Sequence, residues 1–186
     1  ENTACYIEFA SGSFEVDEKM GNNPEEIGRI KDNLISLMQN EKFDLDSIVV
    51  TSSASPEGTV RFNERLSQKR SEGISEYFSK WMNHYQDSLE RERGFAVDEE
   101  GNIIIEKRTQ IPLMGRSSGE NWQMLDRLIE RDTVMTEDEK KSYISSAEIK
   151  DIDQRERSLQ SLGCYRHIRQ KLYPHLRTVR FDFHLH

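Results

Sequence analysis

Residues Ser53–Phe78 read SASPEGTVRFNERLSQKRSEGISEYF, and they predict the end of a strand, a tight turn and a long helix. Ser55-Pro56-Glu57-Gly58 has the composition of a turn, because proline presets φ and glycine adopts conformations that other residues avoid. From near Thr59 to beyond Trp81, apolar residues recur at steps of three and four, the spacing of one helical face. The expected apolar stripe consists of Phe62, Leu66, Ile74, Tyr77 and Trp81, and Arg70 interrupts it.

The residues before this stretch predict a strand, a helix and a second strand. Ala4–Ala10 alternates apolar and polar residues as a strand does, and the polar Ser11–Asn22 is expected to be a loop. Asn23-Pro24 followed by two glutamates predicts a helix start, with Asn23 as N-cap, and this helix should end near Asn40. The continuous β-branched run within Asp46–Ser53 is typical of a strand buried on both faces. The order β-α-β-α predicts a layered arrangement of helices on a sheet.

Beyond the long helix, the sequence predicts a hairpin, a helical region and a final strand. Gly94–Thr109 is expected to form the hairpin, with its turn at Asp98–Asn102 and Ile103-Ile104-Ile105 in the second arm. Ser118–Gly163 has helical spacing, and a last helix should stop at Pro174. The final strand is the clearest in the chain: Val179, Phe181, Phe183 and Leu185 alternate with Arg180, Asp182 and His184.

Trp122, Leu125 and Ile129 lie on one face of a predicted helix. The favoured interpretation is a helix face buried in the domain. A partner-binding surface is the alternative.

Composition excludes several classes of protein. Of the 186 residues, 34 are Asp or Glu and 26 are Lys or Arg, and the net charge of −8 argues against general nucleic-acid binding. No run of 18 apolar residues predicts a membrane-spanning helix. Cys5 and Cys164 leave a disulfide and two part-buried thiols as alternatives. Glu1-Asn2-Thr3 carries neither an initiator methionine nor a signal peptide, which leaves an upstream domain open.

No motif of a known catalytic type occurs in the chain. The sequence lacks a phosphate loop, a glycine-rich dinucleotide fingerprint, G-x-S-x-G and H-E-x-x-H, so we expect neither an enzyme nor a cofactor. His184 and His186 are two residues apart on the outer face of the final strand, but two histidines do not complete a metal site. An exposed strand end is the favoured interpretation of this pair.

The start of the long helix carries the candidate site. Asn63, Ser67 and Arg70 are spaced by four and three residues, which puts them on one helical face near the carboxyl end of the preceding strand. Backbone N–H groups at a helix start and an arginine both favour a carboxylate ligand. The alternative is a capped amphipathic helix whose charges are solvated, and the residues alone leave both interpretations open.

In its β-α-β-α context, Gly58 followed by Asn63, Leu66, Ser67 and Arg70 in the pattern N-x-x-L-S-x-x-R resembles the OmpA-like C-terminal domain, which the peptidoglycan-associated lipoprotein shares. The resemblance covers roughly Ala4–Lys80 and the last strand, and Ile7-Glu8-Phe9 is similar to the family's first strand. Two further stretches look like the variant OmpA-like domains of Bacteroidetes envelope proteins. They read SSGENWQMLDRLIERD and QRERSLQSLGCYRHIRQKLYPHLRTVRF.

The resemblance implies an α+β fold: a single domain over 1–186, with a mixed sheet, helices on one face and a largely helical insertion at 83–176. It implies a non-catalytic domain that anchors an outer-membrane or periplasmic protein to peptidoglycan by binding the diaminopimelate stem peptide. The implied location is the periplasm, at the outer membrane, with other envelope proteins as further partners. A module that kept the fold but assembles envelope proteins is the alternative, and a cell-wall hydrolase is a third hypothesis.

The resemblance also assigns roles to residues. Arg70 matches the arginine that holds a diaminopimelate carboxylate in the family, and Asn63 and Ser67 share its face. The family's aspartate, which holds the ligand's ammonium group, is replaced by Ser55, and Glu57 is close enough in sequence to substitute for it. The implied ligand-binding residues are therefore Arg70, Asn63, Ser55, Ser67 and Glu57.

Overall fold

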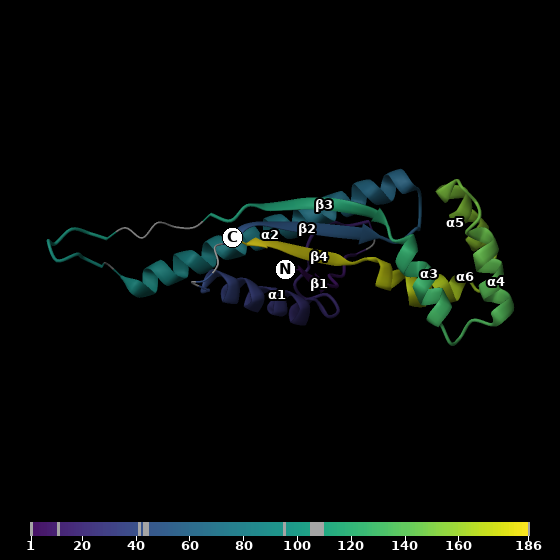
Figure 1. Ribbon diagram of the computed structural model, residues 1–186, viewed down its shortest axis with the longest axis horizontal. Coiled ribbons are helices and arrows are strands. Elements are labelled where there is room, and N and C mark those ends of the chain that lie inside the picture. Colours follow the sequence, from purple (N-terminus) through teal and green to yellow (C-terminus); the bar gives the residue numbers. More distant parts are fainter. Residues whose placement is uncertain are drawn as a thin grey trace.

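A computed structural model describes residues 2–10, 12–40, 42, 45–94, 96–104 and 110–185. One mixed four-stranded sheet carries two long helices, and a group of short helices lies beyond one end of the sheet (Figure 1). A thin arm projects from the opposite end, so the molecule is elongated (Figure 1). The predicted α+β class is confirmed.

The sheet consists of β1 (Asn2–Cys5), β2 (Leu45–Ala54), β3 (Leu113–Glu120) and β4 (Val179–Leu185), in the order β1-β4-β2-β3. β4 is antiparallel to both of its neighbours, whereas β2 and β3 are parallel and need a crossover, which includes the long helix. Phe181 is opposite Thr3 on one side and Val50 on the other. The prediction that the final strand lies within the sheet is confirmed.

The helices differ greatly in length. Two pack on the sheet: α1 (Asn23–Met38) and α2 (Val60–Arg93). The short ones are α3 (Trp122–Arg131), α4 (Glu137–Ser146), α5 (Ile152–Gln160) and α6 (Tyr165–His167), followed by a π-helical turn, Ile168–Leu172, and a 3₁₀ turn, Tyr173–Leu176. Although α2 has 34 residues, no helix of the described part of the chain is long and apolar enough to cross a membrane.

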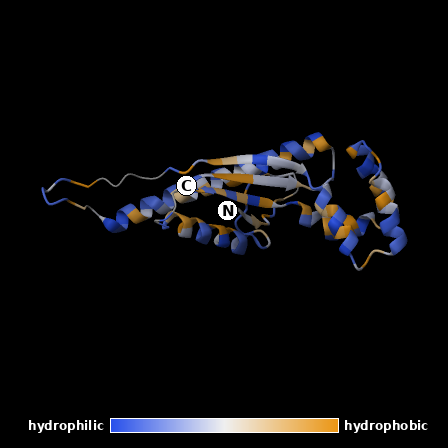
Figure 2. Ribbon diagram, in the orientation of Figure 1, coloured by the Kyte–Doolittle hydropathy of each residue, from blue (hydrophilic) through white to orange (hydrophobic). Residues whose placement is uncertain are grey.

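The main core lies between the sheet and the two long helices. From the sheet come Ile48, Val50, Val179, Phe181 and Phe183, and from the helices Ile27, Ile30, Leu34, Ile74, Phe78 and Met82. Phe78 of α2 meets Phe181 of β4 edge to face, with ring centroids 5.3 Å apart. Apolar stretches run along the strands, whereas the long helices alternate apolar and polar residues (Figure 2). The predicted alternation of the last strand is confirmed: Arg180 and His184 are exposed on the other face of the sheet.

Three local predictions were wrong. The first strand ends at Cys5 rather than Ala10, although Ile7 is still buried. Asn23 is not the N-cap of α1; its buried side chain instead bonds the backbone of Glu8 in both directions, at 2.8 and 2.9 Å. Phe62 is 55% exposed, because polar side chains fill the buried face in the first turns of α2.

The range 83–176, expected to be a largely helical insertion, is helical at its start and in its second half. Its start is still α2, and β3 then joins the main sheet beside β2. The sequence of β3 is LMGRSSGE. Its residues are mostly small and polar, so it lacks the alternation of apolar and polar residues from which a strand is predicted. The hairpin prediction is confirmed where it can be followed: Val97 pairs with Ile103 across a turn at Asp98, whereas residues 105–109 lie outside the described residues.

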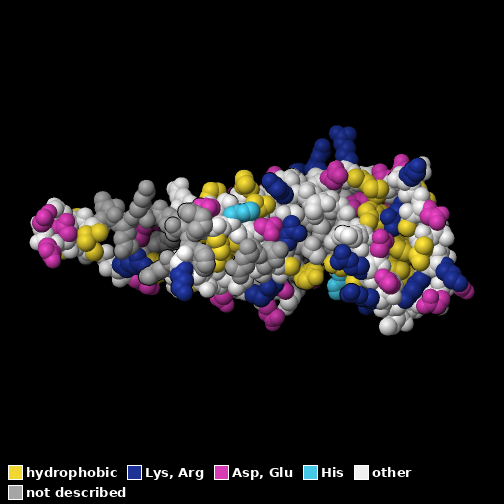
Figure 3. Space-filling model, viewed as in Figure 1, with side chains coloured by type: hydrophobic (Ala, Val, Ile, Leu, Met, Phe, Trp, Pro, Cys, Tyr) yellow, Lys and Arg dark blue, Asp and Glu magenta, His cyan; other side chains and the backbone are white. Residues whose placement is uncertain are grey.

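The short helices enclose a second core. It contains Leu125, Ile129, Tyr143, Leu159, Ile168, Leu172, Tyr173 and Leu176. The prediction of a buried face is confirmed for Leu125 and Ile129, and Trp122 packs against them partly buried. Apolar side chains also gather on the visible surface of this helical end (Figure 3). The two cysteines are free and buried in different cores, so the unpaired alternative holds, and burial raises the pKa of Cys5 to about 12.

Gly115 lets β3 approach α2 closely, and we expect Gly115→Ala to destabilise the protein by about 1–3 kcal/mol. A Cβ atom at this position would lie 2.7 Å from the backbone nitrogen of Glu72, so strand and helix would have to separate. Urea denaturation measures the change. Gly28→Ala is the control, because a Cβ atom there meets nothing within 4 Å and alanine should gain about 0.5–1 kcal/mol inside a helix. Equal stability of the parent and Gly115→Ala would contradict this account of the packing.

Candidate functional site

The site begins where β2 ends and the chain turns into α2. Ser55 and Pro56 are buried in this turn, and Gly58 has a φ of +81°, a conformation that favours glycine. Thr59 then caps the helix, since its hydroxyl accepts a hydrogen bond from the backbone nitrogen of Phe62 at 3.2 Å. The turn therefore fixes the direction in which the first turns of α2 leave the sheet.

Asn63, Ser67 and Arg70 share a face of α2, as predicted, and that face is buried. The three residues are 4%, 1% and 9% exposed. Buried polar groups need partners, so this face cannot be the solvated side of an amphipathic helix. The interpretation as a helix with solvated charges is wrong for these residues.

Two of the three side chains form hydrogen bonds with residues of β3. Asn63 donates a hydrogen bond from Nδ2 to Oε2 of Glu120 at 2.7 Å, and Ser67 shares a hydrogen bond with Ser117. Glu120 also accepts from the indole nitrogen of Trp122 at 3.0 Å. Burial raises the pKa of the Glu120 carboxyl group, and its two donors oppose that shift. These hydrogen bonds hold α2 against β3. Arg70, the third residue of this face, carries a positive charge and contacts neither Glu120 nor Ser117.

Arg70 reaches the loop between β1 and α1. Its Nε donates to the carbonyl oxygen of Ser13 at 2.9 Å, a terminal nitrogen donates to that of Ala10 at 3.5 Å, and the guanidinium lies 4.8 Å from the ring centre of Phe9. No carboxylate contacts Arg70 within the described residues. Burial and the positive charge of Arg177 lower the pKa of Arg70 to about 10.

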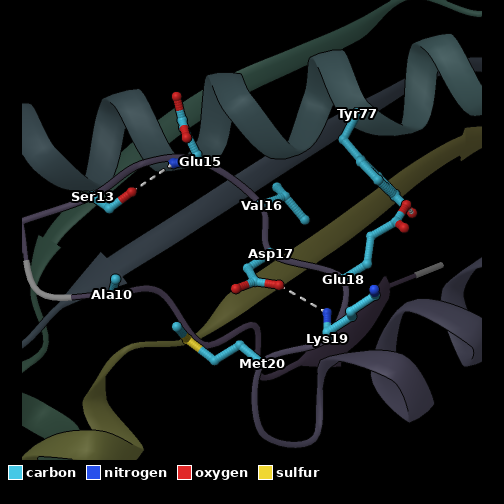
Figure 4. A pocket seen from close by; sticks show the side chains of 9 residues that line it. All are labelled: Ala10, Ser13, Glu15, Val16, Asp17, Glu18, Lys19, Met20 and Tyr77. Atoms are coloured by element: carbon cyan, nitrogen blue, oxygen red, sulfur yellow. Dashed lines mark hydrogen bonds between the residues drawn. The ribbon is translucent and has the colours of Figure 1, made fainter.

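The same loop packs closely along α2. A Cβ atom at Gly73 would lie 2.7 Å from the carbonyl oxygen of Phe14, so glycine permits this approach. Tyr77, one turn further along, donates to Glu18 at 2.5 Å. Figure 4 shows the loop running beside α2, with Tyr77 reaching toward Glu18. Both residues line a cleft of about 510 Å³.

Arg177, which precedes β4, contacts two residues of the turn. Its Nε donates to the hydroxyl of Ser55 at 3.2 Å, and a terminal nitrogen lies 3.9 Å from a carboxylate oxygen of Glu57. The Arg177 side chain is 40% exposed and that of Glu57 is 39% exposed. The structure thus places Ser55 and Glu57 beside a second guanidinium, whose charge also acts on Arg70, while Asn63 and Ser67 point to β3.

A cleft of about 640 Å³ adjoins this cluster. Phe9, which stacks with Arg70, and Arg177 are in its walls, together with Glu8 and His175. An aromatic wall and the Arg177 guanidinium suit a ligand that carries an anionic group.

The helical part of the insertion packs against the turn. The backbone nitrogen of Val60 donates to Asp153 of α5 at 2.9 Å, which satisfies one of the free N–H groups at the start of α2. Nearby Glu156 is buried and accepts from the hydroxyls of Tyr165, at 2.7 Å, and Tyr173. Burial raises the pKa of Glu156, and the charge of Glu57 adds to that shift. One wall of the site therefore belongs to the insertion.

No group of three or more potential metal ligands occurs in the described part of the chain. His184 is exposed on the open face of the sheet, away from Arg70, and His186 lies outside the described residues. What the cluster offers chemically is the Arg177 guanidinium in the wall of a cleft and the Arg70 guanidinium against Phe9 of the same wall, and guanidinium groups are suited to binding an anion.

Sequence reasoning missed Arg177, Glu120 and Phe9. Arg177 is one of several charged residues near the final strand, and nothing in its spacing links it to Ser55. Glu120 ends a strand that the sequence did not predict. Phe9 was assigned only to the alternation of the first strand, and no local pattern in the sequence predicts its contact with Arg70.

No protein-family model matches the chain, and no curated protein matches it significantly.

Proposed function

We propose that this chain is a non-catalytic domain of the cell envelope that anchors an outer-membrane or periplasmic protein to peptidoglycan. In this proposal Arg70 holds a carboxylate of the diaminopimelate residue in the stem peptide. The location of the protein in this proposal is the periplasm, at the outer membrane. The OmpA-like motif of Gly58, Asn63, Leu66, Ser67 and Arg70 supports it, and so does a β-α-β-α order whose last strand enters the sheet between β1 and β2.

The observation that carries the proposal is the environment of Arg70. Arg70 is 9% exposed as a residue, and two carbonyl oxygens and an aromatic ring are the contacts of its guanidinium among the described residues. A second guanidinium, Arg177, is near enough to lower its pKa. Buried charge without an opposite charge is costly, and an anionic ligand would relieve that cost.

Assembly of envelope proteins is a second candidate function, because Arg70 already has hydrogen-bond partners within the protein. Its hydrogen bonds to Ser13 and Ala10 hold the β1–α1 loop, and Ser55 cannot supply the negative charge that an ammonium group requires. On this alternative the chain is an assembly module of the envelope that keeps the fold and has lost peptidoglycan binding.

Crystals soaked in a stem tripeptide that ends in diaminopimelate distinguish the two functions. We expect a carboxylate of the tripeptide within hydrogen-bonding distance of the Arg70 guanidinium, with the peptide along the cleft beside Phe9. Crystals that remain empty at millimolar tripeptide would favour the assembly module. Incubation with purified peptidoglycan should release no fragments, and release would instead support a hydrolase.

A further inference from the structure

The face of the sheet that the long helices leave open carries two arginines on either side of a threonine. Thr51 of β2 is opposite Arg116 of β3 on one side and Arg180 of β4 on the other. Residues paired in this way share a face of the sheet, and each strand lies about 4.8 Å from the next, so the arginine Cα atoms are about 10 Å apart. A row of three hydrogen-bond donors, two of them cationic, therefore crosses the open face.

Most donors of this row have no partner within the protein. Arg116 is exposed, and neither it nor the Thr51 hydroxyl has a hydrogen bond or an ion pair among the described residues. Arg180 donates from Nε to Asp182 at 3.1 Å, and its terminal nitrogens have no partner in the described part of the chain. All three donors line one cleft of about 540 Å³, the open-face cleft, whose volume is in the range of small-molecule sites.

The open-face cleft is positively charged, although the chain as a whole has a net charge of −8. The charged side chains in its wall are Arg116, Arg180 and Asp182, so the wall carries one net positive charge. His184 is the remaining titratable group of the wall. Asp182 is already paired with Arg180. An anion above Thr51 would therefore meet two guanidinium groups and no unpaired carboxylate of the cleft wall.

We propose that the open-face cleft binds a small molecule that carries a phosphate monoester, with the phosphate above Thr51 and one guanidinium on each side. Such a phosphate has nearly two negative charges and three acceptor oxygens, which match the two arginines and the threonine hydroxyl. A carboxylate has one charge and two oxygens, so it would leave one donor of the row unpaired.

This site is separate from the one proposed for peptidoglycan. Arg70 belongs to α2, which packs against the opposite face of the sheet. The two proposals can therefore fail independently of each other.

Phenyl phosphate and benzoate test the selection, because they share a ring and differ in the anionic group. Titrations followed by the NMR signals of the backbone amides at physiological salt give both the affinity and the residues affected. We expect phenyl phosphate to shift the signals of Thr51, Arg116 and Arg180. Benzoate should bind about tenfold or more weakly, as the loss of one charge-assisted hydrogen bond predicts.

Arg116→Gln should weaken the binding of phenyl phosphate about tenfold or more, because it removes one of the two cations. Arg65→Gln is the matched control: Arg65 is exposed on α2, and its substitution changes the net charge equally, so this variant should bind as the parent does. Thr51→Val keeps the shape of the side chain and removes its hydroxyl, which should weaken binding about threefold. Thermal unfolding of each variant shows whether the fold is retained.

Four results would overturn the proposal. Equal affinity for the two compounds, or equal losses in Arg116→Gln and Arg65→Gln, would show a response to charge in general. Shifts confined to Arg177 and the cleft beside Phe9 would place the phosphate at the site proposed for peptidoglycan. An absence of shifts at millimolar phenyl phosphate would overturn it as well, and binding to vesicles of phosphatidic acid in that case would indicate a membrane surface in place of a small molecule.

Discussion

Phe181→Ala is expected to lower the free energy of unfolding of this domain by about 3–5 kcal/mol, the usual cost of truncating a core phenylalanine. Phe181 is fully buried in β4, which pairs with β1 on one side and β2 on the other, and it meets Phe78 of α2. Its removal leaves a cavity where the sheet and the long helix join. Chemical denaturation monitored by circular dichroism measures the loss.

Arg180→Ala is the control for this substitution, because it changes the next residue of the same strand. Arg180 is exposed, and among the described residues its ion-pair partner is nearby Asp182, at 3.1 Å, so the change should stay within about 0.5 kcal/mol. Amide hydrogens of β4 should also exchange at nearly the rate set by global unfolding. Similar losses in both variants, or rapid exchange in β4, would contradict the central position of this strand.

Arg70→Ala is expected to weaken binding to purified sacculi about tenfold or more, since charge-assisted pairs contribute about 1.5–3 kcal/mol. The substitution also removes the contacts with Ser13 and Ala10, so its binding and its thermal unfolding must be measured on the same sample. Arg70→Lys keeps the positive charge but loses the planar fork of donors, and we expect it to bind between the parent and Arg70→Ala.

Arg65→Ala is the matched control, because Arg65 is on the exposed side of the same helix and its removal changes the net charge equally. It should bind sacculi as the parent does. If Arg65→Ala and Arg70→Ala lose the same affinity, binding depends on overall charge and not on the site at the start of α2.

The elements with a strong periodic signal could be predicted from the sequence. The alternation of Val179, Phe181 and Phe183 gave the correct buried face of β4, and β-branched residues gave β2. β3 could not be predicted, because its residues are small and polar and its place depends on parallel pairing with β2 across a long connection. The failed assignment of Phe62 has a similar cause: tertiary contacts of Asn63 and Ser67 determine which side of α2 is buried.

The candidate site was predictable in part. Spacing alone placed Asn63, Ser67 and Arg70 on one face, but it could not show that Asn63 and Ser67 bond the β3 edge. The contact between Arg177 and Ser55 joins residues that are far apart in the sequence, and no local pattern encodes such a pair. The neutral surroundings of Arg70 depend likewise on how the β1–α1 loop packs, which is a property of the folded chain.

Binding to sacculi whose carboxylates have been chemically amidated tests the central claim most directly. The account predicts that the parent protein sediments with untreated sacculi at physiological salt and stays in solution with amidated ones, because Arg70 then has no carboxylate to hold. Sedimentation with both preparations alike, or with neither, would contradict it.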